Sequence, residues 1–418
     1  MTLKRGLHRS VISVLSKRPP VTASPPRIAV AASKSSLPSS VRTLTTTRVA
    51  LQNAKQPDSP NLASSSSSAK ATSTSTNSAH PSTAGEDVVS RSRRSMLYVP
   101  GSSEKMIKKS QSSPADTIIF DLEDSVAAHK KGSARETVFL ALEAAARPGP
   151  ELAVRINPPS ADRSLAEDDL DMVLPSHQLQ AIVVPKVEHE DDIRLIIEKA
   201  RALRPHTETA LALVLSVESA SSLLRMPRII ESIRESLGQD PFTGALLPST
   251  KQPVAQIVAL LFASEDYCAS TGIVRTRQRT SLLFPRAHMA TIAKAYHLAA
   301  IDMVCIDYSD HAYLVDEASE AKQLGFDGKQ AIHPVQVEAI QHTFNPTPEA
   351  VVRAARILFM YERASATEHR GAYGLREADG GMTMIDRPML LQASAVVDKA
   401  RRAGMRIPEA SELEKEQD

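Results

Sequence analysis

The chain has 418 residues, of which 42% are hydrophobic and 23% are charged, as is ordinary for a globular protein. Two cysteines, Cys268 and Cys305, are too few for a disulfide scaffold or a cysteine-based zinc module. No run approaches the ~20 consecutive apolar residues of a membrane span, so we expect no membrane insertion. The first 85 residues hold 11 of the 50 Lys and Arg and one of the 48 Asp and Glu, which leaves 39 basic and 47 acidic residues. This mildly acidic remainder argues against a nucleic-acid partner.

Residues 1–90 have the composition of an organellar targeting segment, because they are rich in Arg and Ser and have no acidic residue before Asp58. Leu3–Leu15 can form a short basic amphipathic helix. Residues 61–85 are nearly all Ser, Thr, Ala and Asn, which predicts disorder. We therefore expect a mitochondrial transit peptide with a disordered linker, and a matrix location. A disordered tail without an address is the alternative.

From about Arg91 onward, short apolar runs alternate with amphipathic stretches, which is typical of a parallel sheet covered by helices. Helical stretches include Asp191–Leu203 and Ala287–Leu298. Eight such units predict an α/β protein with a (β/α)₈ TIM barrel. The expected strands are Met96–Val99, Thr117–Phe120, Ala153–Ile156, Ala181–Val184, Leu211–Val217, Ile257–Phe262, Met303–Ile306 and Lys329–Ile332.

An open doubly wound sheet is the structural alternative, but no Gly-rich phosphate turn follows the first strand. We expect the barrel over residues 91–345, and C-terminal helices with a lid over residues 346–418. Residues 236–255 form an apparent insertion between a helix and the sixth strand, so we place it on the barrel face opposite the chemistry.

Polar residues follow nearly every expected strand, and in a barrel these strand ends converge on one cleft. The oxygen ligands and scarcity of His favour Mg²⁺, or Mn²⁺, over zinc. Glu218 and Asp266 end neighbouring strands and are the expected ligands. Arg155 is a fixed cation suited to a carboxylate or an enolate oxygen, which suggests enolate chemistry on an oxo acid. The carboxylates of the cluster are Asp121, Glu123, Asp124, Glu188, Glu218, Glu265, Asp266 and Asp307.

Several motifs in order resemble the citrate lyase β-subunit-like enzymes of the HpcH/HpaI aldolase/citrate lyase superfamily. The likeness covers about Arg93 to Met405. The matching segments are Arg93-Arg94-Ser95-Met96-Leu97-Tyr98-Val99-Pro100-Gly101, Asp121-Leu122-Glu123-Asp124-Ser125-Val126, Val154-Arg155-Ile156-Asn157, Val184-Pro185-Lys186-Val187-Glu188 and Gly328-Lys329-Gln330-Ala331-Ile332-His333-Pro334.

The resemblance implies a Mg²⁺-dependent carbon–carbon lyase that cleaves a 3-hydroxyacyl-CoA, such as citramalyl-CoA or malyl-CoA, to acetyl-CoA and an oxo acid. The reverse condensation and thioester hydrolysis belong to the same chemistry. The likeness implies that Glu218 and Asp266 are metal ligands. It also implies that Asp386 and Arg155 are catalytic. It places Asp386 in a lid that reaches a neighbouring subunit, commonly in a homotrimer. The residues matching substrate or CoA positions are Tyr98, Lys105, Lys109, Arg155, Ile332 and His333.

Two departures from the family pattern bear on substrate choice: Ala263-Ser264-Glu265 precede Asp266 where glycine is usual, and the lid segment Ala364–Gly381 is slightly long. His333 is alternatively a buried structural histidine set by Pro334. A pyruvate-type metal aldolase without CoA is the nearer alternative function, and a non-catalytic barrel used for assembly or binding is the farther one.

Overall fold

The computed structural model describes residues 88, 91–204, 209–250, 252–368, 373–376 and 381–415, which all fall within one compact unit, Ala79–Asp418. The transit peptide, the helix over Leu3–Leu15 and the disorder of residues 61–85 concern residues outside the described ones. The same holds for much of the lid segment Ala364–Gly381.

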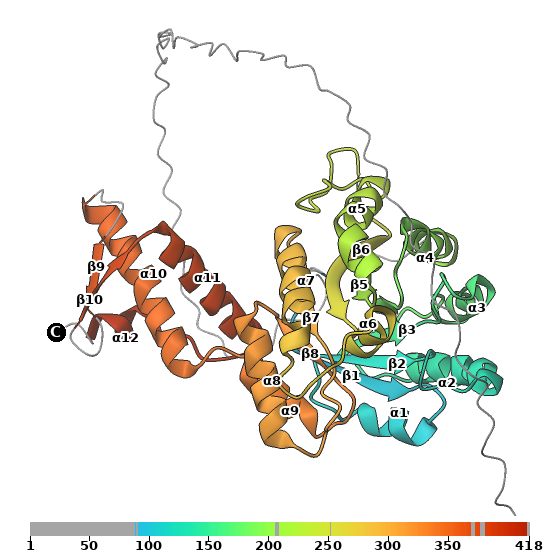
Figure 1. The fold of residues 1–418 in the computed structure, drawn as a ribbon. Coiled ribbons are helices and arrows are strands. Elements are labelled where there is room, and N and C mark those ends of the chain that lie inside the picture. Colours follow the sequence, from blue (N-terminus) through green and yellow to red (C-terminus); the bar gives the residue numbers. More distant parts are fainter. Residues whose placement is uncertain are drawn as a thin grey trace, which may run out of the picture. The chain divides into compact units, whose positions relative to one another are not determined.

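Eight parallel strands pair in chain order and close into a barrel, with β8 against β1 (Figure 1). This confirms the predicted (β/α)₈ TIM barrel and excludes the open doubly wound sheet. The strands are β1 (Ser95–Pro100), β2 (Thr117–Asp121), β3 (Glu151–Arg155), β4 (Ala181–Val184), β5 (Leu211–Val217), β6 (Ala255–Phe262), β7 (Ala299–Asp302) and β8 (Gly328–Ala331).

Helices connect the strands, and two short 3₁₀ turns lie at Ala128–Lys130 and Thr280–Leu282. None of the helices in the described ranges is both long enough and apolar enough to cross a membrane. The barrel helices are α1 (Glu104–Ser110), α2 (Lys131–Glu143), α3 (Arg163–Val173), α4 (Glu190–Leu203), α5 (Ala220–Ser236), α6 (Ser264–Thr271), α7 (Leu283–Ala295), α8 (His311–Gln323) and α9 (Gln336–Phe344).

The described residues of the C-terminal part form three helices and an antiparallel hairpin, in agreement with the expected C-terminal helices. α10 and α11 pack on each other through a small apolar cluster that includes Ile357 and Val397. The elements are α10 (Pro348–Glu368), β9 (Tyr373–Arg376), β10 (Met382–Ile385), α11 (Arg387–Arg402) and α12 (Ala410–Lys415).

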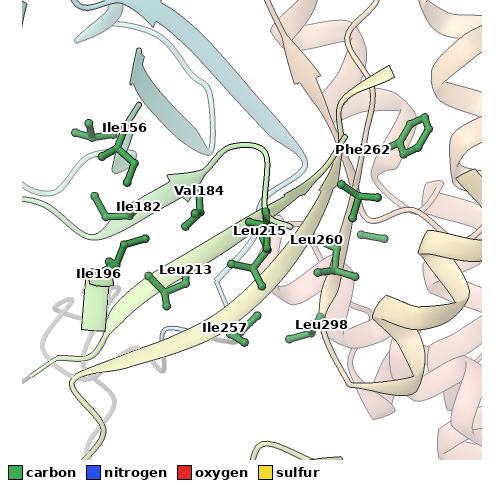
Figure 2. Packing of buried hydrophobic residues seen from close by; sticks show 14 of the residues in the cluster. Ile156, Ile182, Val184, Ile196, Leu213, Leu215, Ile257, Leu260, Phe262 and Leu298 are labelled. Carbon is green, nitrogen blue, oxygen red and sulfur yellow. The ribbon is translucent and has the colours of Figure 1, made fainter. Parts of the chain in front are cut away.

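Most strands are apolar on both faces because one face fills the barrel and the other meets the helices. In β1, for example, Met96 belongs to the interior cluster and Leu97 to the outer one, and β2 repeats the alternation with Ile119 and Phe120. Figure 2 shows part of the outer cluster, which contains Leu213 of β5, Leu260 of β6 and Ile196 of α4. This packing holds the strand ends, and the polar residues that follow them, in fixed positions.

The predicted seventh strand, Met303–Ile306, is wrong, because β7 is Ala299–Asp302. Met303 and Cys305 are fully buried in the loop after the strand, so they imitate the apolar pattern of a strand. Asp302 inside β7 interrupts that pattern, although it is itself buried in ion pairs with Arg286 and Lys329. The shift places Asp307 five residues beyond the strand, where it is exposed.

α7 also differs from its prediction of Ala287–Leu298, since it begins at Leu283 and ends at Ala295. Pro285 lies in the first turn of α7, where the missing amide hydrogen costs nothing. At the other end, His297 has a φ of 56°, in the left-handed region, and this breaks the helix before Leu298.

The segment over residues 236–255 joins the end of α5 to the start of β6, so it lies at the amino ends of the strands, as predicted. Within it, the Phe242 ring stacks on the Tyr296 ring with 6.2 Å between their centres, and Arg234 donates to the carbonyl oxygens of Phe242 and Tyr296. The insertion therefore lies on the face opposite the strand ends that carry the polar cluster, where Phe242 and Arg234 anchor a segment that is otherwise mostly exposed.

Candidate active site

A cavity of about 450 Å³ opens at the carboxyl ends of the strands. Side chains that follow or end β1, β2, β3, β6 and β8 line it, and Met106 of α1 lies at its edge. Of the predicted site residues, the cavity brings together Tyr98, Arg155, Asp266 and Ile332. The polar strand ends therefore converge, as the barrel fold requires.

Arg155 is held rigidly at the end of β3. β2 and β3 pair in a register that sets Asp121 beside Arg155, and Arg155 donates Nε and Nη2 to the two Asp121 oxygens at 2.6 and 2.7 Å. Nη1 lies 2.8 Å from Glu123 Oε2, and the guanidinium stands 4.9 Å from the centre of the Tyr98 ring. These contacts leave Arg155 as a preorganised cation at the cavity wall.

Charge stays on both members of this pair. Burial acts to raise the pKa of Asp121, but the hydrogen bonds and charge of Arg155 outweigh it and hold that pKa below its usual value. Burial likewise acts against the charge of Arg155, and Asp121 more than compensates, so the pKa of Arg155 is raised. Burial raises the pKa of Tyr98, against the influence of Arg155, so its phenol stays protonated.

The β1–α1 turn explains the glycine in the Pro100-Gly101 motif. The Gly101 amide donates to the carbonyl oxygen of Asp121 at 2.8 Å. A Cβ at position 101 would lie 2.7 Å from that oxygen, which is too close for any side chain. Gly101 thus allows the β1 and β2 loops to meet beneath the cavity.

Glu218 and Asp266 follow the neighbouring strands β5 and β6, whose last residues, Val217 and Phe262, are paired. Glu218 is 5% exposed. Its burial, with the charges of Glu123 and Asp266 nearby, raises its pKa to about 7, although Lys186 acts in the opposite direction. Asp266 lies in the first turn of α6 and lines the cavity.

This donor set fits Mg²⁺. A buried carboxylate whose pKa is raised by carboxylate neighbours gains stability when a cation binds beside it. Among the described residues, no group of three or more His, Cys, Asp and Glu side chains forms a metal cage. Magnesium requires no such cage, since it takes one or two carboxylates and leaves its other positions to water and substrate.

Two residues that the sequence motifs contained but to which no role was assigned also belong to the site. The Lys186 Nζ lies 2.6 Å from Glu123 Oε1 and 3.5 Å from Asp266 Oδ1. Gln330 is buried at the cavity and donates to the carbonyl oxygens of Phe262 and Asp302. Their positions just after β4 and within β8 were the available signal.

A buried ion-pair chain behind the cavity was also missed. Arg275 bridges Glu265, the neighbour of Asp266 in sequence, to Glu317 at 2.5 and 2.9 Å, and Lys329 lies 2.8 Å from the same Glu317. Arg275 is distant from Glu317 in sequence and falls in a loop, so only the fold pairs them. Glu265 therefore points into this chain and is already paired.

The other predicted site residues do not line the cavity. Lys105 and Lys109 are exposed on α1. His333 is exposed as well and stacks on Tyr308 at 4.9 Å, so the interpretation as a buried histidine is wrong. Asp386 is exposed and caps α11 by accepting a hydrogen bond from the Met389 amide at 3.1 Å, and it is not among the residues that line the cavity of its own chain.

Asp307 does not join the carboxylate cluster, contrary to the expectation. It accepts hydrogen bonds from the amides of Ser309 and Asp310 in the exposed loop before α8. The misplaced seventh strand caused this error, because it set Asp307 directly at a strand end.

The stability of the metal-free protein should reflect the Glu218 pKa. An acid whose pKa rises on folding, here from 4.5 to about 7, binds more protons when folded, so its contribution to stability decreases as pH rises through that range. Glu218→Gln should leave stability nearly unchanged at pH 4, below the unfolded pKa, and raise it by up to about 3 kcal/mol at pH 8. Urea unfolding in EDTA measures both values. A difference between the proteins that is the same at both pH values would contradict the assignment.

Comparisons with known proteins agree with this site. Residues 94–334 match the family model described as HpcH/HpaI aldolase/citrate lyase. Mitochondrial citramalyl-CoA lyase of Homo sapiens is 35% identical over 319 residues, covering 74% of this chain and 85% of the relative. Citrate lyase subunit beta of Escherichia coli K12 is 30% identical over 328 residues, covering 76% and 96%.

Solved structures share the fold. CitE from Mycobacterium tuberculosis, in complex with magnesium, acetoacetate and coenzyme A, superposes with a TM-score of 0.54 at 24% identity, covering 75% of this chain and 99% of CitE. A citrate lyase from Burkholderia xenovorans superposes with a TM-score of 0.60 at 21% identity, covering 77% and 95%. The chain therefore belongs to the HpcH/HpaI aldolase/citrate lyase family, and it is a lyase related to citrate lyase β subunits and citramalyl-CoA lyase.

Proposed function

We propose that the protein cleaves a 3-hydroxyacyl-CoA, citramalyl-CoA or malyl-CoA, to acetyl-CoA and pyruvate or glyoxylate. One observation carries the proposal: the fixed guanidinium of Arg155 lines the same cavity as Asp266, with the buried Glu218 carboxylate charge-coupled to Asp266. A cation-binding carboxylate pair opposite a permanent cation can hold an oxo acid and an enolate at once.

The bond that breaks joins the carbinol carbon to the methylene beside the thioester. The hydroxyl proton leaves to solvent, the oxo acid forms, and the electron pair of the broken bond moves to the methylene carbon as the enolate of acetyl-CoA, which then takes up a proton to become the acetyl methyl group. Arg155 stabilises the enolate oxygen, because Asp121 and Glu123 hold the guanidinium in place before the charge develops. Tyr98 lies under Arg155 and keeps water from that face.

Glu218 and Asp266 would hold the Mg²⁺, with Mn²⁺ as the alternative ion. The bound ion supplies Lewis-acid polarisation of the substrate's carboxylate and hydroxyl groups. The other family members that bind magnesium, such as CitE from Mycobacterium tuberculosis, support this choice.

The CoA moiety would lie across the mouth of the cavity. Lys105 and Lys109 are four residues apart, so they share one face of α1, whose Met106 lines the cavity. Two exposed ammonium groups there suit the phosphates of CoA. Ile332 and His333, after β8, would contact the substrate next to α1, because β8 pairs with β1.

Asp386 would transfer the proton at the acetyl methyl carbon, and it would do so in the cavity of a neighbouring subunit in a homotrimer. Its exposed position at the start of α11, outside the cavity of its own chain, leaves the carboxylate accessible to a neighbouring subunit. The metal ligands are committed as ionised oxygens, so a separate group is required to donate this proton during cleavage and to remove it in the reverse condensation.

An assay with the full chain and Mg²⁺ tests the reaction. Citramalyl-CoA, malyl-CoA and the free acids citramalate and malate are supplied in turn, and acetyl-CoA, free CoA and oxo acid are quantified. The proposal predicts equal amounts of acetyl-CoA and oxo acid, from the thioesters only. Cleavage of the free acids at comparable rates would instead identify a pyruvate-type aldolase that does not use CoA, and release of free CoA without oxo acid would identify a thioesterase.

We also propose a mitochondrial matrix location, with a transit peptide and linker in residues 1–90, the catalytic barrel in residues 91–345 and the lid region in residues 346–418. Mitochondrial relatives from Homo sapiens and Mus musculus support the location. A fluorescent protein fused after residues 1–60 should accumulate in mitochondria, and removal of basic residues such as Arg5 and Arg9 should reduce import. A cytosolic or secreted fusion would contradict the proposal.

A further inference from the structure

We propose that Lys186 is the resident counter-ion of the carboxylate cluster: it holds the two metal-binding carboxylates in place before a divalent cation arrives, and it competes with that cation. In this role Lys186 is a positioning residue. The inference rests on the proposed metal site at Glu218 and Asp266, and the experiment below separates the two.

The backbone of Lys186 adopts an unusual conformation at the site. Its φ of 48° lies in the left-handed region, which is uncommon for a residue with a side chain. Two contacts hold this conformation: the Ser160 hydroxyl donates to the Lys186 carbonyl oxygen at 2.9 Å, and the Lys186 amide hydrogen-bonds the Glu218 carboxylate. A strained backbone kept by specific contacts is typical of functional positions.

The side chain of Lys186 reaches the other proposed ligand. Its ammonium lies 2.6 Å from Glu123 Oε1, 3.5 Å from Asp266 Oδ1 and 3.9 Å from Asp124 Oδ1. The one residue therefore contacts Glu218 through its amide and Asp266 through its ammonium. Because amide and side chain leave the same Cα, the unusual φ is what lets both groups face the carboxylates.

The charges around Lys186 show why such a counter-ion is needed. Glu123 is 4% exposed and lies between Arg155 and Lys186, while Arg155 is engaged chiefly by Asp121. Among the described ion pairs, the one that Asp266 forms is with Lys186. Without it the carboxylates would repel one another in a partly desolvated cavity.

The same charge opposes a divalent cation. An ammonium 3.5 Å from one metal-binding carboxylate repels Mg²⁺. It also neutralises part of the negative charge with which that carboxylate would attract the ion. Removing the charge should therefore tighten metal binding while it destabilises the metal-free protein. A lysine that served only as an ion-pair partner of Glu123 would affect stability alone, so metal affinity is the distinguishing readout.

The test compares Lys186→Met and Lys186→Gln, which remove the charge, with Lys186→Arg, which keeps it. Lys199→Met is the matched control, because Lys199 forms an ion pair with Asp171 on the surface of α4. Mn²⁺ alone is titrated into each metal-free full-length protein, with free Mn²⁺ followed by electron paramagnetic resonance and Mg²⁺ used for displacement. Thermal unfolding of the metal-free and Mg²⁺-loaded proteins is measured in parallel.

Both uncharged variants should bind Mn²⁺ on the order of tenfold more tightly than the wild type, and Lys186→Arg and Lys199→Met should bind it with nearly wild-type affinity. The metal-free uncharged variants should unfold at a lower temperature and gain more from added Mg²⁺. Equal or weaker binding by the folded uncharged variants would overturn the inference about Lys186. If Lys186→Met fails to fold, Lys186→Gln decides, since its amide can still donate to Glu123. A wild type that binds no Mn²⁺, or an Asp266→Ala variant that binds it equally well, would refute the proposed metal site instead.

Discussion

Replacing Asp266 with alanine is expected to abolish Mg²⁺-dependent cleavage, with a loss in kcat/KM of at least about 10²-fold. Loss of an outer partner of a metal ligand already costs 10–100-fold in affinity or activity, and here a ligand itself is removed. The fold should survive, because Asp266 is partly exposed in the first turn of α6 and its ion pair is a 3.5 Å contact with Lys186. Steady-state rates at several Mg²⁺ concentrations, with circular dichroism, measure both effects.

A surface carboxylate provides the control for this experiment. Asp171 lies on α3 and pairs with Lys199 far from the cavity, so Asp171→Ala should leave the rate and its Mg²⁺ dependence unchanged. An Asp266→Ala protein with full activity, or one that works equally well in a chelator, would show that the metal site is not at this position.

Replacing Asp386 with asparagine is expected to lower kcat by about 10²–10⁴-fold with KM nearly unchanged, since a general base contributes that much and the substitution leaves binding intact. Asparagine caps a helix as well as aspartate does, so the hydrogen bond to the Met389 amide and the start of α11 should persist. Asp386→Ala should lose the same activity and in addition about 1 kcal/mol of helix stability. A kcat near the wild-type value for Asp386→Asn would end the catalytic assignment.

Mixed oligomers determine which cavity Asp386 serves. If Asp386 reaches a neighbouring subunit, mixing Asp386→Asn protomers with Asp266→Ala protomers should restore part of the activity, because some sites then combine an intact metal pair from one chain with an intact aspartate from another. Mixtures that exchange subunits yet remain inactive would place Asp386 over the barrel of its own chain.

The sequence predicted the barrel because most strands are apolar on both faces and are separated by amphipathic helices. β4 and β5 match their predicted bounds, Ala181–Val184 and Leu211–Val217. The predicted bounds of β7 were wrong because its carboxylate, Asp302, is stabilised by Arg286 and Lys329, which lie 16 and 27 residues away. A buried ion pair between distant residues cannot be distinguished from a loop by local hydrophobicity.

The expectation that strand-end residues share one cleft held for Arg155 and Asp266 and failed for Asp307, and it did not predict how the residues pair. That Arg155 is fixed by Asp121 follows from the β2–β3 register, which the sequence does not specify. The importance of Lys186 depends on a single left-handed φ, and lysine gives no local signal for that conformation. Residue type therefore indicated the class of chemistry, and the fold revealed which charged side chains pair with one another.

The most direct test of the account is a single-turnover reaction of the full chain with citramalyl-CoA in D₂O. The deuterium content of the acetyl-CoA product is measured by mass spectrometry. Cleavage through an enolate held by Arg155 predicts one solvent deuterium in each acetyl group, an equal amount of pyruvate, and loss of both in EDTA with recovery on adding Mg²⁺. Acetyl-CoA without deuterium, or cleavage that persists unchanged in EDTA, would contradict the account.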